Sequence, residues 1–381
     1  MRKSELGIYG LQHLLAMISA CILVPLLTGF PVSIALFASG VGTIIFYFVT
    51  DKKVPIYLGS SFAFIAPLAY VVSNNSISAA LGGVIVAGLI YIVVSFGIIK
   101  GGANTLHKLF PTRVTAPIIM LIGLTLAPVA VEQLQTHYIV GIVTLLVTAF
   151  FIITKSTYFS AIPILAGIGA GYLVSIPFGL IELTYNPIIG LPEFTLPTFN
   201  LNAIMLIAPL AIVSIIEHVG DIVAAGEVTE HNYLIDPGIE KTLLGDGLAT
   251  LFAGLVGGIP NTTYSENIGV LKITEKYNPK IMVTAGIFAI LLSFSPFVTG
   301  VINSIPQAVI GGVSILLFGM IFIVGLESLV SIEMNKADNI VIATTMIVGL
   351  GGSILQFGNI EFSSLAVASI VAIVLNLIIK E

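Results

Sequence analysis

The amino-acid sequence predicts an all-α polytopic membrane protein with fourteen transmembrane segments in two inverted repeats of seven. Three features lead to this fold class: a very apolar composition, the placement of every lysine and arginine, and an internal repeat. Of the 381 residues, 57% are hydrophobic and only 9% are charged, against about 25% charged residues in a soluble domain. The composition therefore excludes a soluble globular domain, and the net charge of −5 offers no basic surface to nucleic acid.

Apolar runs of about 20 residues, enough to cross a bilayer, divide the chain between loops and breaks. The first run is too long for a secretion signal, so we interpret it as the first span. Two of the runs, 54–73 and 260–275, are interrupted and polar. The fourteen predicted spans are 7–27, 31–50, 54–73, 79–99, 112–131, 136–154, 159–182, 202–226, 241–258, 260–275, 280–300, 305–325, 337–354 and 363–379.

The basic residues give the orientation of these spans. With the N-terminus in the cytoplasm, all 14 Lys and Arg residues fall on the cytoplasmic side. Cytoplasmic loops of membrane proteins are enriched in Lys and Arg, so this distribution supports both the span count and the orientation. We expect a multi-pass protein of the cell (cytoplasmic or inner) membrane with both termini in the cytoplasm. The opposite connections carry only the acids Glu132, Glu182, Glu193 and Glu361.

An internal repeat relates the two halves of the chain. Residues 12–13 match residues 217–218, and Pro55 matches Pro260, all at an offset of 205 residues. Seven spans in each half give the second half the opposite orientation, which is a feature of many secondary transporters. The predicted repeats are residues 1–201 with spans 1–7 and residues 202–381 with spans 8–14.

The repeat also pairs the two interrupted spans, 54–73 and 260–275. Each opens with a proline, runs through an extended polar stretch, and then becomes apolar. Irregular backbone at membrane depth persists only inside protein or beside a water-filled cavity, and paired broken spans point to a transporter site. We expect a short extended piece followed by a half-helix whose free N–H groups face a ligand.

Buried acids are the candidates for chemistry, because an ionised side chain at mid-bilayer costs at least about 2.5–3.5 kcal/mol. Glu217 and Asp221 lie four residues apart and share one helix face, whereas His218 points about 100° away. These residues are predicted to serve the substrate or a proton; a structural hydrogen bond to a neighbouring helix is the alternative. Asp246 is expected to be a capped or water-facing residue near the cytoplasmic end of its span.

Glu266 follows the proposed start of the second half-helix, where Ser265 and Asn267 are placed to orient it or to line the site. His13 is expected to hold helices together rather than to bind substrate. The sequence contains no metal-ligand or phosphate-loop motif, so no metal and no cofactor are predicted. The one cysteine, Cys21, excludes an internal disulfide.

Four segments, GLQHLLAM, PIYLGSSFAFIAP, EHVGD and PNTTYSENIGV, resemble the signatures of the nucleobase–ascorbate transporter family, also called nucleobase:cation symporter-2. The similarity covers nearly the whole chain and is closest to the bacterial uracil permease branch. It implies a core domain of spans 1–4 and 8–11 beside a gate domain of spans 5–7 and 12–14. It also implies short antiparallel strands in spans 3 and 10 with the ligand between them, proton coupling, and a homodimer.

The resemblance also implies the roles of individual residues. Glu217 and Glu266 become the carboxylates that bind substrate. The backbone N–H groups of Phe62 and Ser265 donate to the substrate, and Ser61 lies beside Phe62 in the same site. With Asn267 these form the expected substrate site, and Glu217, Asp221 and His218 form the expected proton-coupling set. No catalytic residue and no enzyme activity are expected.

Two positions depart from the uracil permease pattern. Ser265 stands where uracil permeases have Gly, and Asp221 stands where they have His, as in the purine-carrying branch. The resulting hypothesis is proton-coupled symport of a nucleobase, most simply uracil, into the cell. A purine permease of the xanthine type is the alternative. An anion carrier of related architecture is disfavoured because two carboxylates would repel an anion. A channel would not need paired broken spans around a buried acid pair, and an intramembrane enzyme is disfavoured because no nucleophile–base or metal constellation is present.

Overall fold

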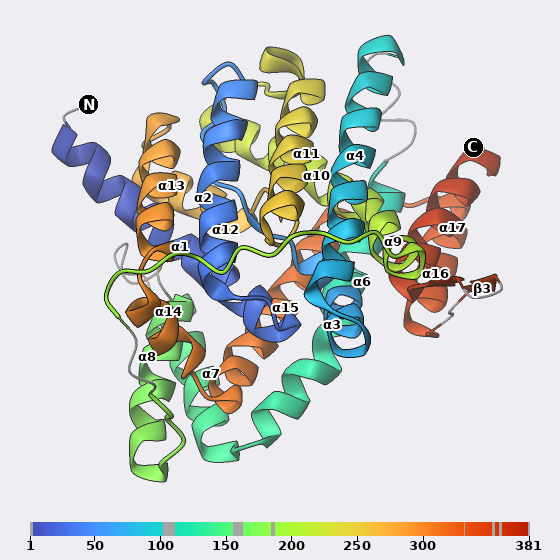
Figure 1. Cartoon of the computed structure of the whole chain (residues 1–381). Coiled ribbons are helices and arrows are strands. Elements are labelled where there is room, and N and C mark those ends of the chain that lie inside the picture. Colours follow the sequence, from blue (N-terminus) through green and yellow to red (C-terminus); the bar gives the residue numbers. More distant parts are fainter. Residues whose placement is uncertain are drawn as a thin grey trace.

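The computed structural model describes residues 3–101, 111–154, 163–183, 187–330, 332–352, 355–357 and 360–379. Arg2, Lys108, Lys155 and Lys380, four of the basic residues that give the predicted orientation, lie outside these ranges. The described chain is a bundle of helices with two short two-stranded sheets (Figure 1).

Six helical stretches in the described ranges are long and apolar enough to cross a membrane, and a pair of helices bent by 85° makes a seventh candidate. The chain is therefore a multi-pass membrane protein. The six stretches are α1 (Lys3–Thr28), α2 (Val32–Val49), α4 (Ile77–Gly101), α6 (Thr112–Gln135), α9–α10 (Leu201–Ile207 and Ala211–Thr229) and α15 (Gln307–Val330), and the bent pair is α13 (Lys280–Ser293) and α14 (Pro296–Asn303).

The remaining helices do not meet this length and composition criterion. They are α3 (Ile65–Asn74), α7 (Tyr138–Ile153), α8 (Pro163–Ser175), α11 (Ile239–Val256), α12 (Ser265–Thr274), α16 (Lys336–Leu350) and α17 (Ser364–Ile378). Of these, α3 and α12 begin inside the bundle. The strands are β1 (Gly59–Ser60) with β2 (Asn261–Thr262), and β3 (Leu355–Phe357) with β4 (Ile360–Phe362).

The helices pack against one another in pairs. The helix α2 packs along α13, and α4 packs along α11, while α6 runs against α15, α7 against α8, and α16 against α17 (Figure 1). Close approach of α4 and α11 depends on Gly88, because a Cβ atom there would lie 2.6 Å from the backbone nitrogen of Leu251. Small residues allow such contacts between membrane helices.

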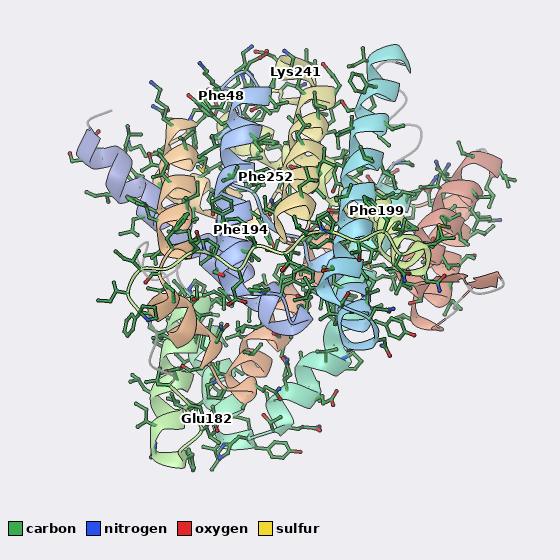
Figure 2. The ribbon with its side chains drawn as sticks, in the orientation of Figure 1. Phe48, Glu182, Phe194, Phe199, Lys241 and Phe252 are labelled. Carbon is green, nitrogen blue, oxygen red and sulfur yellow. The ribbon has the colours of Figure 1, made fainter. Side chains whose placement is uncertain are left out.

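One end of the bundle carries exposed ion pairs between the loop after α2 and the segment before and at the start of α11. Lys53 pairs with Asp236, and Lys241 pairs with Asp51. The hydrogen bond from the Lys53 ammonium lowers the pKa of the Asp236 carboxyl below its ordinary value. Such exposed pairs add little stability. Figure 2 shows Lys241 at this end and Glu182 at the opposite end of the molecule.

A more buried ion pair fastens α6 to α16 and α17. Nη1 of Arg113 lies 3.1 Å from Oδ1 of Asp338, and its Nε donates to Oδ1 of Asn376 over 2.7 Å. Asp338 also completes a capping box with Asn335 at the start of α16. Arg113 therefore links the ends of three helices that are far apart in the sequence.

Candidate substrate site

The two interrupted segments meet through their strands. In this sheet β1 runs antiparallel to β2, with Gly59 opposite Thr262. The N–H of Ser61 extends the pairing by donating to the carbonyl of Pro260 over 2.8 Å. Pairing satisfies backbone polar groups that find no water inside a membrane protein.

Each strand leads directly into a helix that starts inside the bundle. After β1, a 3₁₀ turn (Phe62–Phe64) continues into α3, and after β2 the helix α12 begins at Ser265. The first N–H groups of a helix have no partner within it and form its positive end. The Phe62 and Tyr264 rings pack edge to face, with their centroids 5.6 Å apart. The Tyr264 hydroxyl donates to the carbonyl of Ser60. The two helix starts are therefore neighbours.

A cavity of about 500 Å³ lies against these helix starts. One wall comes from α10, with the carboxylates Glu217 and Asp221, and from the aromatic residues Phe62 and Tyr264. Its opposite wall is formed by apolar side chains of α15, including Leu317 and Met320, with contributions from α6, α7 and α8. A mostly apolar pocket with few polar groups is typical of small-molecule sites, which range from about 300 to 1,000 Å³.

Two carboxylates of α10 line this cavity, Glu217 and Asp221, as their four-residue spacing on one helix face predicts. The Thr263 hydroxyl donates to Oδ2 of Asp221 over 2.9 Å. Between the two acids, Gly220 also lines the cavity, and a Cβ atom at this position would meet nothing within 4 Å. The acids thus share an open space with the start of the half-helix.

His218 faces the other way, into the contact between α10 and α11. Its Nε2 lies 2.9 Å from the Thr242 hydroxyl, and its Nδ1 lies 2.8 Å from Oδ2 of Asp246, although off the axis of a straight hydrogen bond. The expectation that Asp246 is capped or faces water is wrong, since its side chain is 0% exposed. The side chain instead meets His218 because α11 packs this face against α10.

Two other candidate residues do not line the cavity. The Ser61 hydroxyl lies 3.2 Å from that of Ser214. Oδ1 of Asn267 lies 2.9 Å from Nδ1 of His13, and its amide nitrogen donates to the carbonyl of Pro55. Asn267 therefore joins α12 to α1, and the expectation that His13 holds helices together is confirmed.

Ser265 and Glu266 form the first turn of α12, but their side chains lie outside the described part of the chain. Sequence reasoning missed Thr263 and Tyr264, although both lie in the segment PNTTYSENIGV. It also missed the α15 wall, which is mostly apolar and carries Ser328 as its one polar lining residue. Among the described residues, no group of three or more His, Cys, Asp or Glu is arranged to hold a metal ion.

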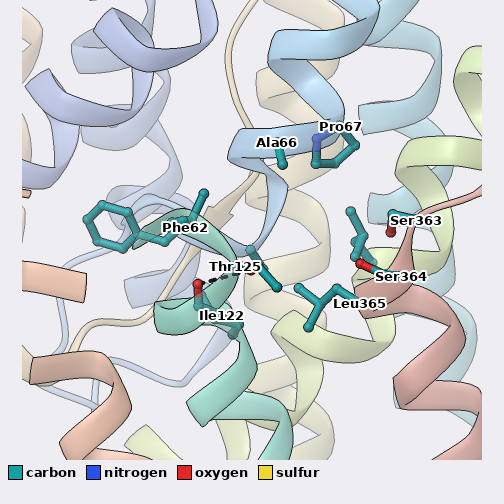
Figure 3. Close-up of a pocket in the computed structure, with 11 residues that line it drawn as sticks. Phe62, Ala66, Pro67, Ile122, Thr125, Ser363, Ser364 and Leu365 are labelled. Carbon is teal, nitrogen blue, oxygen red and sulfur yellow. Dashed lines mark hydrogen bonds between the residues drawn. The ribbon is translucent and has the colours of Figure 1, made fainter. Parts of the chain in front are cut away.

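A smaller cavity, of about 50 Å³, also borders Phe62 (Figure 3). It lies farther along α6, at residues 122–126, than the larger cavity, which touches α6 at Ile119. Ser363 and Ser364, just before and at the start of α17, supply hydroxyls to its wall. Phe62 therefore stands between the carboxylate cavity and a second, much smaller space.

Known proteins similar to this chain are bacterial permeases. A probable uracil permease of Haemophilus influenzae is 40% identical over 396 residues, covering 100% of this chain and 95% of that protein. The uracil permease of Escherichia coli K12 is 39% identical over 390 residues, covering 97% and 90%. Among solved structures, the transmembrane domain of the cyanobacterial bicarbonate transporter BicA is similar in fold, with a TM-score of 0.71, 16% identity and 98% of both chains covered.

A model of the Permease family matches residues 4–358, which is most of the chain. The match agrees with the apolar helices and with the permeases that resemble the full length of the sequence. Proteins of this kind move solutes across membranes and are not enzymes. The chain therefore belongs to the Permease family.

Proposed function

We propose that this protein is a secondary active transporter that carries a nucleobase, uracil in the first place, into the cell together with protons. Similarity to two uracil permeases supports the substrate class. The observation that carries the proposal is the position of Glu217 and Asp221 on a cavity where two broken spans begin their helices. Such a meeting point is where secondary transporters bind their substrates.

The chemistry of this cavity matches a flat ring with N–H and C=O groups on its edges. Glu217 and Glu266 would accept hydrogen bonds from the ring N–H groups. The backbone N–H groups of Phe62 and Ser265 would donate to the ring oxygens. A site built of such groups rejects analogues that lack them, because its own polar groups would be left unpaired.

A binding panel on the purified protein tests the substrate: uracil, thymine, xanthine, hypoxanthine, guanine and ascorbate. We expect uracil to bind most tightly. Tighter binding of xanthine would favour the purine alternative, which the acid at Asp221 supports. Bicarbonate is a further competitor because of the fold similarity to BicA. We expect no binding of this anion, because Glu217 and Asp221 border the cavity, and saturable bicarbonate binding would refute the proposal.

Proton coupling is proposed to involve Glu217, Asp221 and His218, with His218 acting through its buried pair with Asp246. The Thr242 hydroxyl donates to the carbonyl of residue 239 over 3.0 Å, so Nε2 of His218 must be the donor in their contact. Nδ1 and the Asp246 oxygen, 2.8 Å apart, then require one shared proton to avoid repulsion between lone pairs. We assign this proton to the His218–Asp246 pair, which lies between α10 and α11.

Uptake into proteoliposomes tests the coupling. An imposed inward proton gradient is expected to drive accumulation of labelled uracil, and collapse of that gradient with a protonophore is expected to abolish accumulation. Accumulation driven by a sodium gradient at equal pH on both sides would contradict proton coupling without affecting the substrate assignment.

We further propose that the chain forms fourteen crossings in two inverted repeats, divided into a core of spans 1–4 and 8–11 and a gate of spans 5–7 and 12–14. The same order of helix, helix, strand and half-helix occurs in both halves. The contact of α4 with α11 is the repeat image of the contact of α2 with α13. Movement of the core against the gate would then exchange access between the two cavities that meet at Phe62.

We propose that both termini lie in the cytoplasm, that the protein resides in the inner membrane, and that it forms a homodimer there. Exposed Lys53 and Lys241 lie together at one end of the bundle, which supports this choice by the positive-inside rule. The only cysteine, Cys21, is buried, so single cysteines introduced at Glu182 and Lys276 can be labelled selectively. In spheroplasts we expect a membrane-impermeant reagent to label position 182 and to spare position 276. Light scattering in detergent measures the oligomer.

A further inference from the structure

Residues 187–200, here called the strap, run as an extended segment across the bundle before α9. Figure 1 shows the strap crossing in front of α2, α11 and α4. The N–H of Gly190 donates to the carbonyl of Phe294 at the end of α13, and that of Thr198 donates to Ser78 in the first turn of α4, both over 2.9 Å. The strap is therefore fastened to the C-terminal end of α13 and to the first turn of α4.

The side chains of the strap are unusually apolar for an exposed segment. Glu193 is the only charged residue in these 14 positions. Figure 2 labels two of the aromatic side chains, Phe194 and Phe199. The exposed large hydrophobic residues are Ile188 (75%), Ile189 (80%), Leu191 (79%), Phe194 (52%), Leu196 (81%) and Phe199 (68%). Such a concentration on a protein surface indicates contact with an apolar partner.

The backbone of the strap limits how deep it can lie. An extended segment exposed to lipid is not tolerated in the hydrocarbon core, because its N–H and C=O groups would have no partners. Pro187, Pro192 and Pro197 recur every fifth residue and remove three N–H donors from the segment. An apolar segment with few free donors suits the boundary between head groups and acyl chains, where water still reaches the backbone.

Exposed apolar surface continues on either side of the strap. The N–H of Phe297, a residue that is 55% exposed, donates to the carbonyl of Pro187 at one end. Leu201, which is 63% exposed, follows the other end at the start of α9, and Leu255 near the end of α11 is 51% exposed. The strap thus belongs to a continuous apolar surface of a membrane protein.

We propose that the strap lies in the membrane–water boundary and inserts its apolar side chains among the lipid acyl chains. The partner is the lipid surface, since the strap offers one charge and no basic group to a polar protein. In this position the strap holds the ends of α4 and α13 at a fixed depth while it connects α8 to α9. The inference depends on residence in the membrane and not on the substrate.

The absence of tryptophan from the chain gives a clean test. Leu196→Trp and Ile189→Trp each introduce a single fluorophore into the strap. Two references are Leu146→Trp, at an exposed mid-helix site of α7, and Tyr277→Trp, in the loop between α12 and α13. Each variant is reconstituted in lipids brominated either near the head-group end or near the chain terminus, and aqueous iodide is added separately.

We expect both strap tryptophans to emit at shorter wavelength than Trp at position 277. Quenching by lipids brominated near the head group should be about twofold stronger than by lipids brominated at the chain end, with the reverse order at position 146. Quenching by iodide alone, as at position 277, would overturn the proposal. Protection from iodide and from both lipids would also overturn it, because a protein partner such as a second copy would then cover the strap. Melting curves verify that each variant is folded.

Discussion

The contact between Thr263 and Asp221 gives the sharpest test of the candidate site. Replacing Thr263 by Val keeps the shape of the side chain and removes the hydroxyl that donates to Asp221 over 2.9 Å. A hydrogen bond to a charged group contributes about 1.5–3 kcal/mol, and each 1.4 kcal/mol changes an affinity tenfold. If this bond holds Asp221 in the orientation that meets substrate, the Kd for the bound nucleobase should rise by about 10- to 100-fold.

The measurement is a binding isotherm for uracil and for xanthine on purified protein, with size-exclusion chromatography to show that the variant is folded. Thr148→Val is a matched control, since Thr148 lines the same cavity but donates to the backbone carbonyl of Thr144 over 2.7 Å. The control should change the Kd by less than about threefold. An equal and small effect of both substitutions would refute a role for Asp221 in binding either base.

Three further substitutions probe other parts of the molecule. Glu266→Gln should abolish uptake while the protein remains folded, because it removes the negative charge that the site is proposed to present to ring N–H groups. Asp246→Asn should lower the free energy of unfolding by about 3–5 kcal/mol, because it leaves a buried partner uncompensated; adding His218→Asn should restore part of this loss in thermal melts. Arg113→Met should lower the melting temperature by several degrees, because it releases α6 from Asp338 and from Asn376.

Each of these has its own control. Glu182→Gln is the same chemical change at an exposed position and should leave uptake intact; normal uptake by Glu266→Gln would remove that residue from the site. Strictly additive losses at positions 246 and 218 would show that the two side chains are not coupled. Lys276→Met removes an exposed positive charge, and a melting temperature equal to that of Arg113→Met would mean that the Arg113 contacts contribute nothing.

Much of the candidate site was predictable from local pattern. Helical periodicity places Glu217 and Asp221 on one face and turns His218 away from it, and the structure has this arrangement. The polar stretches 54–73 and 260–275 each contain a strand and a half-helix start, because a proline and β-branched residues interrupt the helical pattern there.

The errors concern residues whose surroundings come from distant parts of the chain. Asp246 was expected to be capped or to face water, but it meets His218 because α10 and α11 pack side by side. Nor did the sequence indicate that Asn267, a predicted site residue, would contact His13, 254 positions earlier. The apolar wall of α15 has no feature that separates it from any other membrane helix.

Composition and charge distribution by themselves determined that this chain is a membrane protein. Spans must be apolar over about 20 residues, and Lys and Arg are concentrated in cytoplasmic loops. Local periodicity determined which acids share a helix face. Only the tertiary structure decided which side chains border the cavity, which acid is paired with a histidine, and where the strap crosses the bundle. Those outcomes depend on contacts between segments far apart in the sequence, such as Phe62 and α15 on the walls of one cavity. The energy of such a contact depends on both partners, so neither local sequence predicts it.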